Sequence, residues 1–208
     1  MKICILSTGR AGSTSLYNAF KLHLSNDYYS ITEPFNYDMK RMSPIEENQF
    51  DYINNCENVL IKSIITQIPP NMDMDSYYEW TFNFFDYVVL LDRRDEKLQS
   101  ESFAFLRYTN ETDWHLKKKR YNMSKVPKEF LNEIHNGVIR FKKILTDLSI
   151  KYKHKIYYYE DIFIVHNRKI IEEIFKGITN KIDEDIITRL IISDHMKVRI
   201  DEKVNKLI

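Results

Sequence analysis

The first 24 residues constrain the fold most strongly, because an apolar run, a loop of small residues and an amphipathic segment follow one another there. The apolar run covers residues 3–6, the loop covers residues 7–14, and Leu16, Phe20 and Leu24 then recur at helical spacing. A strand, a short loop and a helix N-terminus together present free N–H donors and partial positive charge at one point. This order predicts a binding site for phosphate or sulfate at the loop.

The loop differs from the P-loop of nucleoside triphosphatases, which carries a lysine directly after its second glycine. Here Gly12 is followed by Ser13 and Thr14, and the nearest cation is Arg10. A planar guanidinium can donate to two anionic oxygens, and the two hydroxyl groups can add donors from the first helical turn. The alternative interpretation is a tight turn at Gly9 and Gly12 with Ser13 as an ordinary helix cap.

A second charged cluster, Asp92-Arg93-Arg94-Asp95, follows the apolar run 87–91. Ser102 lies eight positions after Arg94, about two turns into the next segment, so both side chains can reach one phosphate group. The alternative interpretation is a solvated charge cluster at the end of a strand.

Two further charged residues stand beside or within apolar runs. Glu33 precedes a proline, which favours an extended backbone, so we expect it at a strand end, where ligands bind in open parallel sheets. It could take the proton of a hydroxyl group there, and the alternative is a surface carboxylate in a turn. Lys62 lies inside the run 59–65, where an ammonium is costly unless it reaches water or an anion. We leave open whether Lys62 meets water or a substrate.

The motif Ser-Thr-Gly-Arg-Ala-Gly-Ser-Thr-Ser-Leu at residues 7–16 resembles the 5′-phosphosulfate-binding loop of sulfotransferases that use 3′-phosphoadenosine 5′-phosphosulfate (PAPS). The form Arg-Arg-Asp-x-x-x-Gln-x-x-Ser at residues 93–102 is similar to the 3′-phosphate motif of the bacterial trehalose-type, carbohydrate branch. Tyr-Glu-Asp at 159–161 recurs in this family at the end of a late core strand. The chain departs from the many relatives that have Arg-Asp-Pro-Arg after the strand, and Arg199 is a candidate for the C-terminal donor loop.

The resemblance implies in-line transfer of a sulfuryl group from PAPS to a hydroxyl group on a carbohydrate or small metabolite. It implies that Arg94 and Ser102 bind the 3′-phosphate, that Glu33 is the general base and that Arg10 stabilises charge on the bridging oxygen. Lys62 is a further candidate catalytic residue, because of its place in the apolar run. The residues expected to bind the 5′-phosphosulfate are Arg10, Ala11, Gly12, Ser13 and Thr14.

The alternation of elements predicts the fold class. Apolar runs typical of buried parallel strands cover residues 2–7, 28–32, 58–65, 86–92 and 154–160. Helical spacing between and after them, strongest over residues 127–149, predicts an α/β, P-loop-like layered fold with a central, mostly parallel sheet of about five strands flanked by helices. A length of 208 residues suits a single domain, residues 1–208, and the polar stretches 36–57, 66–85 and 107–125 are candidate acceptor-site loops.

Composition narrows the partners and the location. A net charge of +1 gives no field for nucleic acid, and no apolar run approaches the ~20 residues of a membrane span. With no secretory signal and two cysteines, we expect a cytoplasmic protein without membrane or nucleic-acid partners, a homodimer being one option. Histidine and cysteine spacing fits no metal site, and we give Asp73-Met74-Asp75 little weight as one, so no metal is expected.

Two other functions stay open at this point. The first is a P-loop-type phosphotransferase, or kinase, acting on a nucleotide or metabolite, although the lysine that such enzymes carry in the loop is missing. The second is a non-catalytic nucleotide-binding protein with the same fold.

Overall fold

The computed structural model describes residues 1–24, 27–36, 49–109 and 123–179, together with Glu184, Thr188 and Leu190. Its strands are β1 (Lys2–Ser7), β2 (Tyr29–Thr32), β3 (Val59–Ile64), β4 (Tyr87–Asp92) and β5 (Ile156–Tyr158). Its helices are α1 (Ser13–His23), α2 (Gln49–Asn55), α3 (Met74–Phe84), α4 (Glu96–Thr109), α5 (Lys128–Tyr152), α6 (Tyr159–Phe163) and α7 (Arg168–Lys176), with a 3-10 turn at Met123–Lys125.

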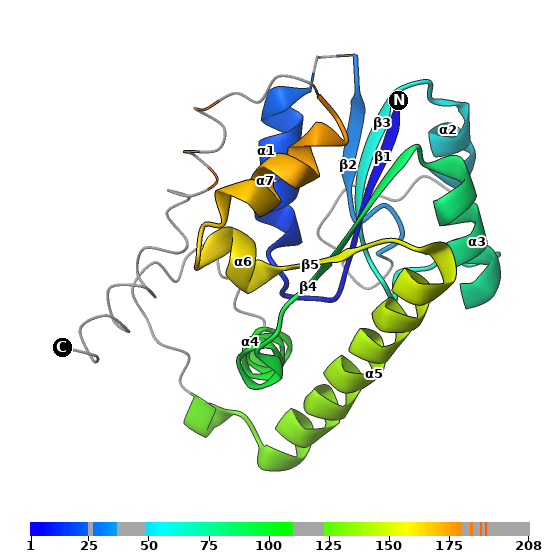
Figure 1. Cartoon of the computed structure of the whole chain (residues 1–208). Helices are drawn as coiled ribbons and strands as arrows, with labels where there is room; N and C mark the ends of the chain where they lie inside the picture. The colour runs from blue at the N-terminus through cyan, green and yellow to red at the C-terminus, as the bar shows by residue number, and fades with distance from the viewer. Residues whose placement is uncertain are drawn as a thin grey trace.

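The strands form one sheet in the order β2-β3-β1-β4-β5, and every neighbouring pair is parallel. Helices cover both faces, with α1 and α7 on one side and α2, α3 and α5 on the other (Figure 1). Ile3 and Ile5 belong to the apolar cluster beneath α1 and α7, while Cys4 and Leu6 belong to the cluster beneath α3 and α5. Because successive side chains of a strand face opposite sides, the residues of β1 between Lys2 and Ser7 are all apolar.

These elements confirm the predicted α/β layered fold and all five predicted strands. The sheet is wholly parallel among the described strands, and the predicted helix at 127–149 is α5. Of residues 180–208, the structure describes only Glu184, Thr188 and Leu190. None of the helices in the described ranges has the length and apolar character of a membrane span.

The predicted end of the last strand is wrong. The sequence predicts a strand over residues 154–160, but β5 ends at Tyr158 and Tyr-Glu-Asp at 159–161 opens helix α6. Glu160 and Asp161 stand in the first turn of that helix, where its dipole favours carboxylates. The tyrosine run favours a strand by local propensity. From Tyr159 onward, the interaction of the Glu160 and Asp161 carboxylates with the positive end of the helix dipole favours a helix.

The predicted loops at 36–57 and 66–85 also need correction, since they contain helices α2 and α3. Asp73 caps α3 by accepting a hydrogen bond from the Ser76 amide at 2.8 Å, which gives the Asp-x-Asp pattern a structural role. Tyr77 of that helix is fully buried, so α3 serves as core. Most of the segment 107–125, with its basic block 117–120, lies outside the described residues.

Gly177, which ends α7, lies in close contact with the ring of Tyr87. A Cβ atom at this position would lie 2.1 Å from Tyr87 Cζ, and the ring cannot retreat freely because its hydroxyl donates to the Ile174 carbonyl at 2.8 Å. Overpacking of this kind costs about 1–3 kcal/mol, so Gly177→Ala should lower the free energy of unfolding by that amount.

Gly137 is the matched control for this prediction. A Cβ there meets only Phe141, at 4.0 Å, in the middle of α5. Gly137→Ala should therefore raise the free energy of unfolding by about 0.5–1 kcal/mol, since alanine is the better helix former. Urea denaturation measures both changes, and equal stabilities for the two variants would contradict the packing around Gly177.

Candidate functional site

The loop between β1 and α1 has the backbone geometry of an uncapped helix N-terminus. Gly12 is the N-cap residue, with a left-handed φ of 81°, and no side chain caps the helix. A Cβ atom at Gly12 would lie 2.6 Å from Phe163 Cε2 and 2.8 Å from Tyr159 Cδ2, so this position requires glycine. The interpretation of Ser13 as a simple helix cap is thus wrong. The amides of Ser13 and Thr14, which have no acceptor within the helix by its geometry, are left for a ligand.

Helix α4 holds the loop from the other side. Arg10 has a left-handed φ of 66°, and its Nε atom donates to Ser102 Oγ at 2.9 Å. Gln99 is fully buried and donates to the Thr8 hydroxyl at 2.8 Å and to the Gly9 carbonyl at 2.7 Å. The sequence predicts that Ser102 shares a phosphate with Arg94, and in the structure its hydroxyl accepts the hydrogen bond from Arg10. The supporting role of Gln99 was not predicted, although its place in the Arg-Arg-Asp-x-x-x-Gln motif marks it.

Lys62 and Glu33 form a buried ion pair next to the loop. The Lys62 ammonium contacts Glu33 Oε1 and donates to Thr14 Oγ1 at 3.3 Å, and the lysine is 4% exposed. The parallel register brings the pair together, because Thr32 of β2 lies beside Lys62 of β3 and the Glu33 amide donates to the Lys62 carbonyl at 2.6 Å. The ammonium therefore faces an acidic group and the loop.

Glu33 is held as an ionised carboxylate. Its Oε2 atom accepts hydrogen bonds from Asn36 at 2.7 Å and from Gln67 at 2.8 Å. Burial opposes ionisation, but the Lys62 ammonium and the hydrogen bonds together lower the pKa of Glu33 below its ordinary 4.5. Glu33 also has a left-handed φ of 51°, and such strain in a residue other than glycine is concentrated at functional sites. A deprotonated carboxylate held in this way can accept a proton.

A second ion pair lies at the end of β4, beside the same loop. Asp92 Oδ1 accepts from the Thr8 hydroxyl at 2.6 Å, and Asp92 Oδ2 accepts from Lys142 Nζ at 2.9 Å. Lys142 was not predicted as a site residue. It lies four residues after Val138 and three before Leu145 on the buried stripe of α5, and a lysine inside an apolar stripe is the signal that could have found it.

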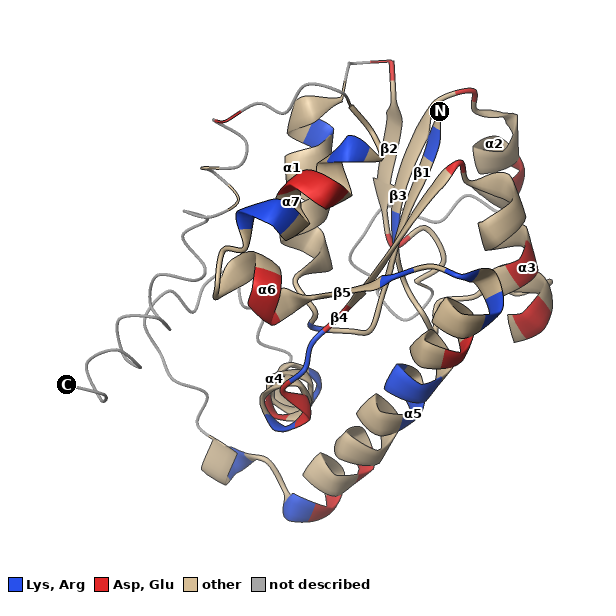
Figure 2. Cartoon of the chain, viewed as in Figure 1, with Lys and Arg blue, Asp and Glu red and all other residues tan. Residues whose placement is uncertain are grey.

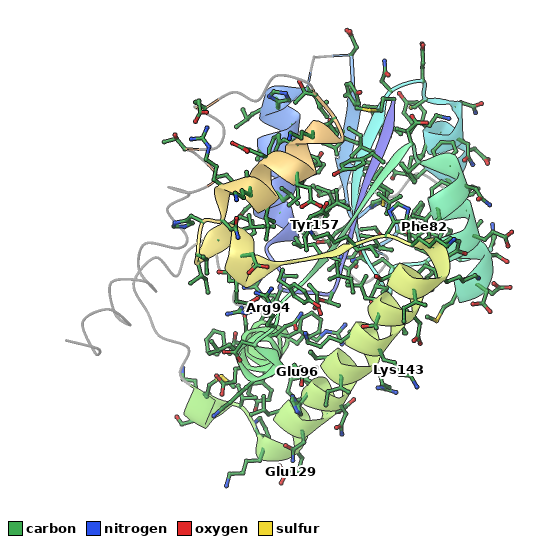
Figure 3. All side chains as sticks on the ribbon, in the orientation of Figure 1. Phe82, Arg94, Glu96, Glu129, Lys143 and Tyr157 are labelled. Carbon is green, nitrogen blue, oxygen red and sulfur yellow. The ribbon has the colours of Figure 1, made fainter. Side chains whose placement is uncertain are left out.

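Arg94 has a partner within the chain. Its two terminal nitrogens donate to the two oxygens of Asp161, each at 2.6 Å, and its guanidinium lies 4.2 Å from the centre of the Tyr158 ring. The side chain is half exposed beside α4 and β5 (Figure 3). Among the described residues no hydrogen bond joins Arg94 to Ser102, so their shared contact with a 3′-phosphate stays a prediction.

The charged residues of the site lie at the carboxyl ends of the strands. Figure 2 shows basic segments of the ribbon where β4 leads into α4 and acidic segments in the neighbouring α6. In the part of the chain that the structure describes, no group of three or more His, Cys, Asp or Glu residues is placed to hold a metal ion. Arg199 lies outside the described residues.

The fold and site together define a parallel α/β domain with a glycine-containing turn, an arginine and a lysine–carboxylate pair at the carboxyl ends of its central strands. Comparison with known proteins adds no family, because no family model, curated protein or solved structure matches this chain. The functional conclusion therefore depends on the chemistry of the site.

Proposed function

We propose that this protein transfers a sulfuryl group from PAPS to a hydroxyl group on a carbohydrate or small metabolite. The observation that carries the proposal is the position of the Lys62 ammonium between Thr14 of the loop and the Glu33 carboxylate. Transfer from a bound anion to a hydroxyl group needs a cation beside the anion and a base beside the hydroxyl. The Lys62 ammonium contacts both sides of such a site, because it donates to Thr14 of the loop and pairs with the Glu33 carboxylate.

The loop would bind the donor end of the reaction. The amides of Ser13 and Thr14 point from an uncapped helix start, and the Ala11 and Gly12 backbone completes the turn around the 5′-phosphosulfate. Arg10 would neutralise charge that grows on the bridging oxygen as the sulfur–oxygen bond breaks. Catalysis in such a transfer is mainly positioning and charge stabilisation, as in phosphoryl transfer.

Glu33 would receive the proton. The acceptor oxygen forms a bond to sulfur, the bond from sulfur to the bridging phosphate oxygen breaks, and the hydroxyl proton passes to the Glu33 carboxylate. Adenosine 3′,5′-bisphosphate (PAP) leaves with the electron pair of the broken bond. Attraction of Lys62 toward the sulfuryl oxygens would weaken its hold on Glu33, and that raises the proton affinity of the carboxylate at the moment of transfer.

The two alternatives gain no support from the site. A phosphotransferase would use a carboxylate beside the loop to hold magnesium, but both oxygens of Asp92 already accept hydrogen bonds, one of them from the Lys142 ammonium. A purely binding protein would have no use for the strained, ionised Glu33 next to Lys62. We also propose that the protein acts in the cytoplasm on a small-molecule or carbohydrate acceptor.

The release of PAP from PAPS, measured by chromatography with a panel of hydroxyl acceptors, tests this proposal. Arg10→Met should slow release about 10- to 100-fold, because a hydrogen bond to a charged group contributes about 1.5–3 kcal/mol. Arg140→Met is the matched control, since Arg140 is exposed on α5, and it should keep the wild-type rate. Equal rates for the Arg10 variant and the wild type would contradict the assignment of the loop.

A further inference from the structure

Arg93 is a buried cation whose ion pair with Glu160 includes no hydrogen bond. The residue follows β4 directly and is 4% exposed. Its Nε atom is buried and makes no hydrogen bond within the described residues, and the nearest carboxylate oxygen, Glu160 Oε1, lies 3.8 Å from it. That separation is too long for a hydrogen bond. An arginine stays charged at every accessible pH, so burial of its Nε–H group without a hydrogen bond carries a desolvation cost.

Glu160 is engaged elsewhere and compensates Arg93 only in part. Its Oε2 atom accepts from the Arg94 amide at 2.9 Å, and its Oε1 atom accepts from the Asp95 amide at 3.2 Å. The carboxylate thereby fixes the backbone that follows β4. The Arg93 guanidinium therefore has a buried N–H donor without a hydrogen-bond partner in the described ranges, and such a group can bind an external anion.

The Tyr159 ring lies between Arg93 and the loop that we assign to the donor. Its guanidinium carbon is 4.7 Å from the centre of the Tyr159 ring. The same ring lies so close to Gly12 that an added Cβ would be 2.8 Å from Tyr159 Cδ2. Tyr159 therefore connects the buried cation to the uncapped start of α1. Arg94 differs, because both of its terminal nitrogens are paired with Asp161.

We propose that Arg93, rather than Arg94, is the arginine of the Arg-Arg-Asp run that binds an oxyanion of the donor. Arg94 is then a positioning residue that fixes α6 to the end of β4 through Asp161. The choice of a PAPS-type nucleotide rests on the proposed function, whereas the oxyanion chemistry rests on Arg93 itself. Phosphate and sulfate share this chemistry, since each offers oxygens to a planar guanidinium.

Arg93→Met and Arg94→Met are the matched variants, because both remove one charge from adjacent positions. Calorimetric titration with PAP should show a loss of affinity of about tenfold or more for Arg93→Met, and a change of less than about threefold for Arg94→Met. Adenosine 5′-monophosphate distinguishes the two phosphate groups. A loss for PAP alone places Arg93 at the 3′-phosphate, and a loss for both nucleotides places it at the 5′ end.

The melting temperature of the ligand-free proteins separates binding from a structural role. Arg93→Met should melt near the wild-type temperature, because Glu160, which pairs with Arg93 only at 3.8 Å, keeps its hydrogen bonds from the Arg94 and Asp95 amides. Arg94→Met should melt lower, since it leaves Asp161 without its partner. A markedly lower melting temperature for Arg93→Met than for Arg94→Met would make Arg93 a structural residue and overturn the proposal.

Inorganic sulfate, titrated at constant ionic strength, separates failure of this proposal from failure of the proposed function. If wild-type protein binds PAP no better than adenosine 5′-monophosphate, the proposed PAPS donor is wrong. The anion site at Arg93 is still supported in that case if sulfate raises the melting temperature of the wild type but not that of Arg93→Met. Wild-type PAP affinity in Arg93→Met, with affinity lost in Arg10→Met, overturns the Arg93 assignment alone. If Arg93→Met does not fold, the PAP affinity of Arg93→Lys decides: a reduced value supports the proposal, and the wild-type value overturns it.

Discussion

Glu33→Gln is expected to lower turnover about 10²- to 10⁴-fold, the range that a positioned general base contributes, while the affinity for PAP stays within a few-fold of wild type. Glutamine keeps the shape of the side chain and can still accept a hydrogen bond from Lys62, but it cannot take the hydroxyl proton. Initial rates of PAP release at saturating PAPS and acceptor measure the first quantity, and calorimetric titration measures the second.

Asn36→Ala is the matched control for the Glu33 prediction. It removes one 2.7 Å hydrogen bond to Glu33 Oε2 and leaves both the carboxylate and its ion pair with Lys62. A hydrogen bond to a charged group contributes about 1.5–3 kcal/mol, but the base itself remains in this variant, so turnover should fall by less than in Glu33→Gln. Full activity in Glu33→Gln would place the general base elsewhere.

Lys62→Met is expected to lower the free energy of unfolding by about 3–5 kcal/mol at neutral pH, because it strands a buried carboxylate. The Lys62 and Glu33 side chains are 5% and 14% exposed, so water cannot replace the lost ammonium. Urea denaturation measures the change. The double variant Lys62→Met, Glu33→Gln should be more stable than Lys62→Met alone, since it no longer carries that charge. If the stability lost in the double variant equals the sum of the losses in Lys62→Met and Glu33→Gln, the two side chains are not coupled.

The same pair makes a prediction for pH. Because folding lowers the pKa of Glu33, its ionised form contributes stability above its ordinary value of 4.5, and this contribution is lost as the pH falls through the lowered value. In Lys62→Met the buried carboxylate takes up a proton more readily, so acid relieves the cost of its charge. The stability difference between wild type and this variant should therefore shrink from pH 7 toward pH 4, and a constant difference would contradict it.

The strands could be predicted because their signal is local. Residues 3–6 and 59–61 are apolar throughout, and burial on both faces of a parallel sheet requires that. The end of β5 could not be predicted in the same way. The tyrosines at 157–159 all favour a strand, and the switch to α6 at Tyr159 accompanies contacts that Glu160 makes with the backbone after β4, more than 60 residues earlier in the chain.

Several charged residues of the candidate site stand out in the sequence, but most of their contacts do not. Glu33 and Lys62 each stood out alone, and their pairing depends on the register of β2 against β3, which no local pattern encodes. Arg93 and Arg94 are adjacent, so spacing alone cannot decide which one turns inward. The inward position of Arg93 accompanies the packing of Tyr159 against both Gly12 and Arg93. These three residues are far apart in the sequence, so no local pattern shows that contact.

Calorimetric titration of the purified protein with PAP, beside ATP with magnesium under the same conditions, tests the central claim most directly. A sulfotransferase must recognise the 3′-phosphate that PAP carries and ATP lacks. The account predicts that PAP binds at least about tenfold more tightly, the scale of one hydrogen-bonded contact to a charged group. Tighter binding of ATP with magnesium would contradict the sulfotransferase proposal and favour a phosphotransferase.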